Sequence, residues 1–95
     1  MSTGFEKPDL YVVARFLDIL YEQGSPMKKT NIQMRLGVNY PRFIDYLEWL
    51  VSKGFVIKDE ELIENSEAFR LSVKGTEAYH RIVDWIRETM EGIRL

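Results

Sequence analysis

Cysteine is absent from the 95-residue chain, which excludes a disulfide framework and any thiolate metal site. Stability must therefore come from side-chain packing or from association between copies of the chain. The single histidine, His80, has no second imidazole or thiolate with which to share a metal ion. We expect neither a metal site nor another cofactor, and we expect His80 to face solvent.

Long apolar runs are also missing. No uninterrupted stretch approaches the roughly 20 residues that span a bilayer, and the first residues lack the basic and apolar regions of a secretory signal. We therefore expect a soluble cytoplasmic protein without a membrane partner. Patterns typical of catalysis, such as a nucleophilic triad or a Walker-type glycine loop, are absent too. We predict no catalytic residue, and hence a binding protein rather than an enzyme.

Net charge is close to zero, at −2, which argues against a protein that coats nucleic acid through bulk electrostatics. The distribution of charge along the chain is more informative. Residues 25–58 contain two acidic residues and six basic ones, namely Lys28, Lys29, Arg35, Arg42, Lys53 and Lys58. Residues 59–67 contain five acidic residues and no basic one. A cationic segment is therefore followed directly by an anionic one.

Two helices are predicted in the first third of the chain. Asp9 is placed to cap a helix that ends at Gly24, after residues 1–8, which we expect to be flexible. Ser25 and Pro26 form a cap and first-turn pair for a second helix, which ends at about Leu36. Apolar residues recur at three- and four-residue spacing in both segments, so each helix has one buried face.

A third helix is capped by Asn39, tolerates Pro41 in its first turn and closes at Gly54. Its expected inner face consists of Tyr40, Phe43, Ile44, Leu47, Leu50 and Val51. Its expected outer face consists of Arg42, Asp45, Tyr46, Trp49, Ser52 and Lys53. The outer face is the one available for binding.

Residues 55–58 and 68–73 are rich in β-branched and aromatic side chains, which predicts a hairpin with a long acidic tip. Ser72 can cap a last helix that runs nearly to residue 95, with one apolar face and one charged face. The predicted fold class is therefore mainly α (α+β), with three helices, a β-hairpin and a C-terminal helix. A compact domain is expected over residues 9–75, followed by the C-terminal helix over 76–95.

The middle of the chain carries a recognisable pattern. It contains Thr30, Ile32, Leu36, Val38, Asn39-Tyr40, Tyr46-Leu47, Leu50, Lys53-Gly54-Phe55 and Leu71-Ser72-Val73-Lys74-Gly75. This pattern covers about half the chain and resembles the archaeal winged helix-turn-helix family of small DNA-binding proteins and predicted transcriptional regulators. That family includes the Sulfolobus chromatin-type proteins, which have a C-terminal dimerisation helix. Two features depart from it: an acidic hairpin tip, or wing, and a shorter last helix.

The resemblance implies that the third helix enters the major groove of double-stranded DNA and that the second helix contacts phosphates. Arg42, in the first turn, would then pair with a guanine and discriminate by roughly 1–3 kcal/mol. The predicted DNA-contacting residues are Lys28, Lys29, Thr30, Asn31, Arg35, Asn39, Tyr40, Arg42 and Tyr46. The alternative is that Lys28, Lys29 and Arg35 are solvated charges on an ordinary helix surface.

The last helix is longer than a winged-helix body can cover, so part of its apolar face would be exposed in a monomer. We therefore expect a homodimer whose interface is formed by Tyr79, Ile82, Val83, Ile86, Met90 and Ile93. A two-fold dimer favours DNA half-sites about 34 Å apart, or a multiple of that spacing. The alternative is that the last helix folds back along the first helix and completes a monomeric core.

The leading hypothesis is a homodimeric transcriptional regulator or chromatin-associated protein that binds double-stranded DNA. The alternative is a protein-interaction module that docks a partner through Tyr46, Trp49 and the acidic wing and does not bind DNA. The acidic wing itself has three alternative interpretations: a solvated tip, a protein-docking site, or a site for a hard cation. The wing lacks the calcium-loop pattern of alternating Asp or Asn with a central Gly.

Overall fold

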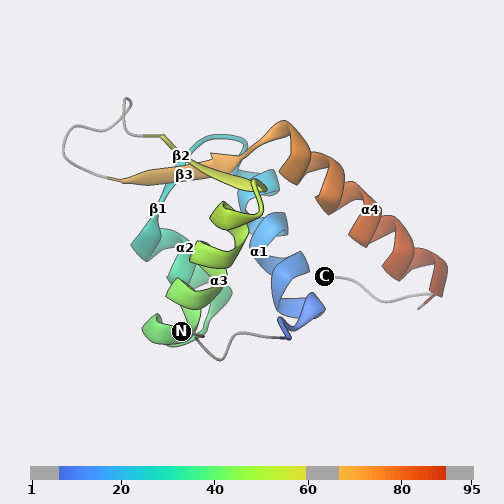
Figure 1. The fold of residues 1–95 in the computed structure, drawn as a ribbon, viewed down its shortest axis with the longest axis horizontal. Coiled ribbons are helices and arrows are strands. Elements are labelled where there is room, and N and C mark those ends of the chain that lie inside the picture. The colour runs from blue at the N-terminus through green and yellow to red at the C-terminus, as the bar shows by residue number, and fades with distance from the viewer. Residues whose placement is uncertain (1–6, 60–66, 90–95) are drawn as a thin grey trace.

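The computed structural model describes residues 7–59 and 67–89, and these form the predicted succession of helices and a hairpin (Figure 1). The elements are α1 (Leu10–Gln23), β1 (Met27–Lys28), α2 (Lys29–Leu36), α3 (Tyr40–Ser52), β2 (Val56–Asp59), β3 (Ala68–Leu71) and α4 (Val73–Thr89). In Figure 1, α1 lies between α4 and the pair formed by α2 and α3. None of the helices in the described part of the chain is long and apolar enough to cross a membrane. The hairpin tip and the predicted interface residues Met90 and Ile93 lie outside the described residues.

The helix ends form as the capping residues predict. Asp9, Asn39 and Ser72 each accept a hydrogen bond from a backbone N–H two or three residues further on, at 2.8, 3.0 and 2.9 Å respectively. Gly24 and Gly54, which follow α1 and α3, have φ of 72° and 80°. Glycine adopts this left-handed conformation without a steric penalty, so both helices end where the sequence predicts.

The start of α2 differs from the prediction. Ser25 and Pro26 do not cap it, because α2 begins at Lys29 and the two residues before it form the short strand β1. This strand pairs antiparallel with β3, which gives a three-stranded sheet in the order β1-β3-β2. The pairing buries the Met27 side chain and gives the backbone hydrogen-bond partners that a helix start would leave unsatisfied.

The core lies where α1, α2 and α3 meet the sheet. Phe16 of α1 and Phe43 of α3 are fully buried, with nearly parallel rings whose centroids are 5.7 Å apart. The pair belongs to one buried cluster of apolar side chains, which also includes Leu17, Leu20, Ile32, Leu36, Leu50, Val56 and Phe69.

The buried face of α3 is rotated relative to the predicted one. Tyr46, predicted to face outward, is only 2% exposed, and its hydroxyl accepts a hydrogen bond from the backbone N–H of Asp9 at 2.8 Å. Tyr40 and Val51, predicted to lie inside, are 50% and 41% exposed. A buried phenol needs a hydrogen-bond partner. The chain just before α1 supplies it, and this long-range contact explains the rotation.

Arg15 of α1 caps the end of α2. Its guanidinium donates hydrogen bonds to the backbone carbonyls of Leu36 at 2.7 Å and Arg35 at 3.1 Å. Carbonyls in the last turn of a helix have no intrahelical partner, and a cation there also complements the helix dipole. The short helix α2 is thereby anchored to α1.

The first half of α4 packs against α1. Tyr79 is 7% exposed, donates a hydrogen bond to Asp18 at 2.5 Å and stacks on Tyr21, with ring centroids 4.5 Å apart. Burial and the adjacent Asp18 carboxylate raise the pKa of Tyr79, so its hydroxyl remains a donor. The second half of α4 diverges from α1 (Figure 1), and Trp85 there is 55% exposed. Ile82 and Val83 still pack against the core. The alternative to a dimerisation arm, in which the last helix folds back onto its own domain, therefore describes α4 as far as Val83.

Candidate nucleic-acid interface

The helix α2, the turn after it and the first turn of α3 form one continuous basic segment. Residues 28–44 contain four basic residues and no acidic one. Seven of the nine predicted DNA-contacting residues are exposed on this segment: Lys28, Thr30, Asn31, Arg35, Asn39, Tyr40 and Arg42. Lys29 is half-buried, and Tyr46 leaves the set because it is buried in the core.

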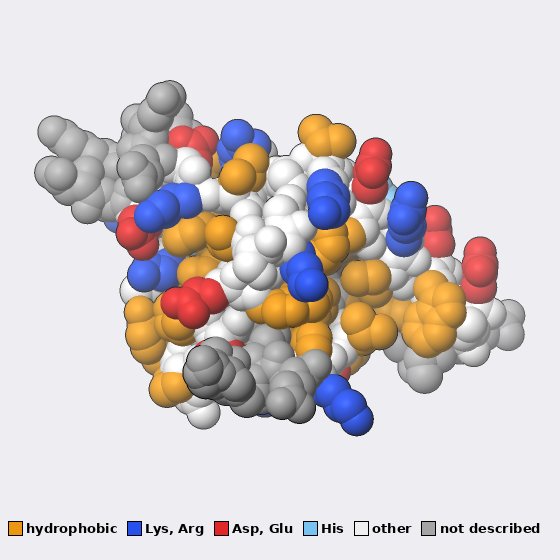
Figure 2. All heavy atoms as spheres, viewed as in Figure 1, with side chains coloured by type: hydrophobic (Ala, Val, Ile, Leu, Met, Phe, Trp, Pro, Cys, Tyr) orange, Lys and Arg blue, Asp and Glu red, His pale blue; other side chains and the backbone are white. Residues whose placement is uncertain are grey.

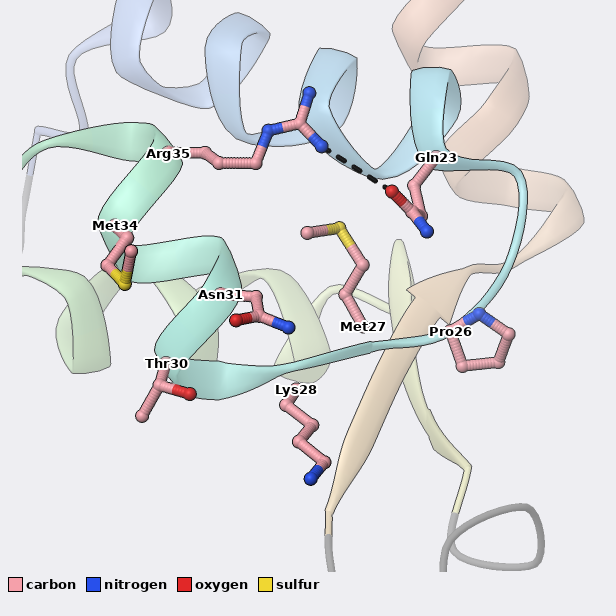
Figure 3. A pocket seen from close by; sticks show the side chains of 8 residues that line it. All are labelled: Gln23, Pro26, Met27, Lys28, Thr30, Asn31, Met34 and Arg35. Atoms are coloured by element: carbon pink, nitrogen blue, oxygen red, sulfur yellow. Dashed lines mark hydrogen bonds between the residues drawn. The ribbon is translucent and has the colours of Figure 1, made fainter.

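Four of these side chains lie around an open cavity of about 610 Å³ beside α2 (Figure 3). They are Lys28, Thr30, Asn31 and Arg35. The guanidinium of Arg35 extends toward Gln23 of α1, with 3.5 Å between Nη1 and Oε1, whereas Lys28 points away from both. This N···O distance is at the limit of a hydrogen bond, so the guanidinium can turn to another acceptor. The residues around the cavity therefore include two cations and two short polar side chains, and the Lys28 ammonium is directed away from the Arg35 guanidinium.

The first turn of α3 carries Arg42, the remaining basic residue of this segment. The Arg42 guanidinium lies over the Tyr46 ring, 5.4 Å from its centroid, in a cation–π contact. The Asn39 side chain accepts a hydrogen bond from the Arg42 N–H and fixes the turn. Further along the same helix, Asp45 and Glu48 are exposed. Only the first turn of α3 is therefore suited to contact an anionic ligand.

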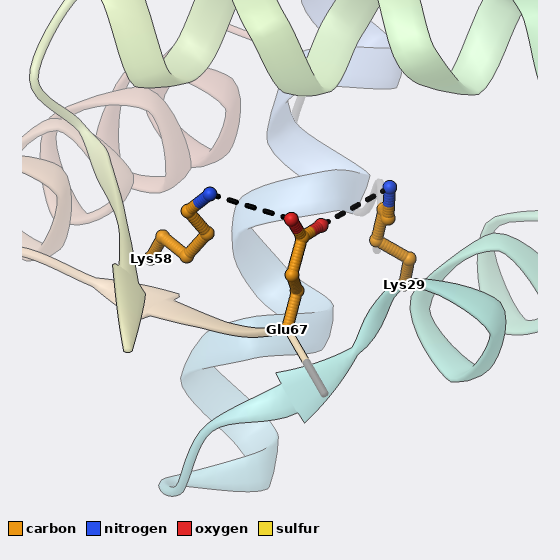
Figure 4. Close-up of polar contacts among 3 residues, drawn as sticks. All are labelled: Lys29, Lys58 and Glu67. Carbon is orange, nitrogen blue, oxygen red and sulfur yellow. Dashed lines mark hydrogen bonds and ion pairs between the residues drawn. The ribbon is translucent and has the colours of Figure 1, made fainter. Parts of the chain in front are cut away.

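Lys29 is held by an acidic residue of the hairpin. Its Nζ lies 3.2 Å from one carboxylate oxygen of Glu67, and the other oxygen lies 3.3 Å from Nζ of Lys58 (Figure 4). Hydrogen bonds from Lys29 and Lys58 lower the pKa of Glu67. Lys58 is not among the predicted site residues. In the sheet, Lys58 of β2 is paired with Phe69 of β3, and Glu67 lies two residues before Phe69. Only this register would have revealed the contact between Lys58 and Glu67.

The surface predicted for a protein partner is not formed as expected. Tyr46 is buried, and Trp49 packs partly buried against the core, with Nζ of Lys53 5.8 Å from its ring centroid. Of the wing, the structure describes Glu67 and Asp59, which forms an ion pair with Arg70 at 3.4 Å. Within the described part of the chain, the residues predicted to dock a partner therefore contact their own chain.

The arrangement of helices and sheet recurs in solved structures. F93 from STIV, a winged-helix DNA-binding protein, superposes with a TM-score of 0.79 over 93% of this chain and 100% of that chain, at 12% identity. RosR from H. salinarum gives a TM-score of 0.72 over 97% and 84%, at 21% identity. A mutant of S. aureus MepR bound to an oligodeoxyribonucleotide gives 0.71 over 81% and 57%, at 16% identity. The chain spans little more than half the length of the MepR structures, and identities this low show a shared fold.

A search of curated proteins found no match. A family model described as winged helix-turn-helix matches residues 10–90, which include all the helices and strands of the described chain. The chain therefore belongs to the winged helix-turn-helix family.

Proposed function

We propose that this chain is a cytoplasmic transcriptional regulator that binds double-stranded DNA as a homodimer. The observation that carries the proposal is the run of four basic and no acidic residues over 28–44, on the helix-turn-helix of a winged-helix fold. In such a unit the first helix contacts phosphates, and the start of the second helix reaches base edges. The descriptions of F93 as DNA-binding and of a MepR mutant as bound to an oligodeoxyribonucleotide support the same assignment.

The proposed roles follow from position and charge. Arg42, exposed in the first turn of α3, is the base contact, because a guanidinium can donate two parallel hydrogen bonds to guanine. The phosphate contacts are Lys28, Arg35 and Lys29. Lys29 becomes available once it is released from its ion pair with Glu67. Uncharged donors complete the surface, namely Thr30, Asn31, Asn39 and Tyr40. Asp45 and Glu48 confine the base contacts to the beginning of the helix.

The test of this function compares Arg42→Ala with Lys28→Ala on two duplexes, one selected by the protein from a random library and one of mixed sequence. Arg42→Ala should weaken binding to the selected duplex by about 5- to 150-fold more than binding to the mixed duplex, which corresponds to 1–3 kcal/mol of base discrimination. Lys28→Ala should weaken both by the same factor, because phosphates carry no sequence information. Equal effects of the two substitutions on both duplexes would refute the role of Arg42.

The proposed dimer interface lies on the second half of α4. Figure 2 shows hydrophobic side chains along α4 and beside it on the helical body. Trp85 is 55% exposed and Ile86 is half-buried. Ile82 and Val83 are also half-buried, but they pack in part against the core of their own chain. Tyr79 is withdrawn from the predicted interface, because it is buried against α1 in its own chain. A second copy of α4 would cover the remaining apolar surface and orient two DNA-binding units by a two-fold axis.

Ile86→Asp is expected to weaken dimerisation by at least about 30-fold, because the interface would bury an unpaired carboxylate. Thr89→Asp adds the same charge one turn away at an exposed position and is the matched control. Sedimentation equilibrium measures both. A wild-type chain that remains monomeric at tens of micromolar would contradict the proposed dimer.

A further inference from the structure

Glu67, at the base of the wing, bridges two lysines from different elements (Figure 4). Lys29 is the first residue of α2, and Lys58 lies in β2. The carboxylate oxygens lie 3.2 Å from Nζ of Lys29 and 3.3 Å from Nζ of Lys58. One anionic group therefore holds together two cations that are far apart in the sequence.

We propose that Lys29 and Lys58 form a binding site for one phosphate of double-stranded DNA, and that Glu67 occupies this site in the free protein. The inference rests on the proposed DNA-binding function. A carboxylate and a phosphodiester are both monoanions that present two terminal oxygens on one central atom, so each can accept hydrogen bonds from two ammonium groups at once. The position of Glu67 therefore marks a place that a phosphate can take.

Solvent exposure makes the exchange feasible. The side chains of Lys29, Lys58 and Glu67 are 34%, 41% and 44% exposed. Ion pairs this accessible to water contribute little to stability and are weakened by salt. Binding a DNA phosphate lowers the free energy more than these ion pairs do, because neutralising the phosphate releases counterions condensed on the duplex. A duplex can therefore displace Glu67.

The site borders the helix proposed to enter the major groove. A groove of about 350 Å³ between α3 and the sheet is lined by Glu67, both lysines, and residues of α3 that include Glu48 and Val51. A phosphate in this groove would lie beside α3. Glu67 is thus an intramolecular competitor that lowers the affinity for DNA of any sequence.

The experiment is an anisotropy titration of a labelled mixed-sequence duplex with the full chain and its variants at about 50 mM salt. Glu67→Gln keeps the side-chain length and removes the charge, and we expect it to bind about two- to fivefold more tightly than the wild type, the range set by exposed ion pairs. Glu88→Gln, at an exposed position on α4, makes the same change in net charge and should bind like the wild type. Thermal unfolding of each variant verifies that it is folded.

Coupling to the lysines distinguishes release of the site from general repulsion of DNA. In a Lys29→Gln/Lys58→Gln background, Glu67→Gln should not increase the affinity for DNA, because neither lysine remains to be released. An equal gain in both backgrounds would overturn the site, since Glu67 would then act only by repulsion, as Glu48 can from the same groove. No gain from Glu67→Gln, with the wild type still binding, would overturn the site and leave DNA binding intact. Failure of every variant and the wild type to bind would instead overturn the proposed function, and the site with it.

Discussion

Gly75→Ala is expected to lower the free energy of unfolding by about 3 kcal/mol or more, the upper range for overpacking of a buried position. Gly75 is buried in the first turn of α4. An added Cβ would overlap the backbone carbonyl oxygen of Phe55 and lie 2.9 Å from the carbonyl carbon. That carbonyl cannot retreat without loss, because it accepts a hydrogen bond from the Ser72 N–H at 3.0 Å. The substitution should force α4 away from the start of the hairpin.

Helix propensity alone predicts the opposite sign, since alanine is favoured over glycine within a helix by about 1 kcal/mol. The steric overlap is the larger effect. Gly24→Ala is the control: its added Cβ meets nothing within 4 Å, and its φ is 72°. It should therefore cost only the left-handed backbone conformation, about 1–2 kcal/mol. Urea unfolding compares the two, and a Gly75→Ala variant as stable as the wild type would contradict the close approach of α4 to Phe55.

Replacing Lys28, Arg35 and Arg42 together by glutamine is expected to weaken binding to double-stranded DNA by at least about 100-fold at low salt. Two of these side chains lie around the cavity beside α2, and the third lies in the first turn of α3. All three are exposed, so their removal should leave the fold intact. The expected loss comes from phosphate neutralisation by the first two and base contact by the third. Fluorescence anisotropy with a labelled duplex measures it.

The matched control replaces three exposed cations of α4, namely Lys74, Arg81 and Arg87, by glutamine. Both triple variants change the net charge from −2 to −5, since each loses three positive charges. The control should retain most of the affinity, because attraction depends on where cations meet phosphates and is screened beyond about 10 Å. Equal losses in the two variants would indicate that binding follows net charge, and would refute the assignment of the site to α2 and α3.

The parts of the fold that depend on neighbouring residues could be predicted from the sequence. Asp9, Asn39 and Ser72 cap helices through hydrogen bonds that span two or three residues, and Gly54 follows α3 through its own backbone conformation. Such interactions join residues that are close in the sequence, so the sequence alone predicts them. For the same reason the exposure of Arg42 in the first turn of α3 could be predicted.

Features set by distant residues could not be predicted. The strand β1 exists only because β3 lies beside it, whereas the local sequence of Ser25 and Pro26 predicts the start of a helix. Helical spacing with Leu47 at the centre of the buried face predicts that Tyr46 lies outside, whereas its hydroxyl is satisfied by Asp9, which is 37 residues away. Arg15, whose bonds cap α2, also acts across 20 residues or more.

The same distinction holds for the candidate site. The exposed polar and basic residues of α2 follow from helical spacing and charge, and seven of the nine predicted residues are exposed. The ion pairs of Lys29 and Lys58 with Glu67 depend on how the sheet docks beside α2. Charge counts along the chain place the cationic and anionic segments next to each other in sequence, but they could not show that Glu67 contacts Lys29 and Lys58.

The most direct measurement is the affinity of the wild-type chain for a labelled duplex at about 50 and about 200 mM salt, followed by anisotropy. A dimer with three phosphate contacts per chain, from Lys28, Lys29 and Arg35, should bind about 10³-fold more weakly at the higher salt, because each contact adds about 0.9 to the slope of log affinity against log salt. No binding at the lower salt, or an affinity that does not change between the two, would contradict DNA binding through this surface.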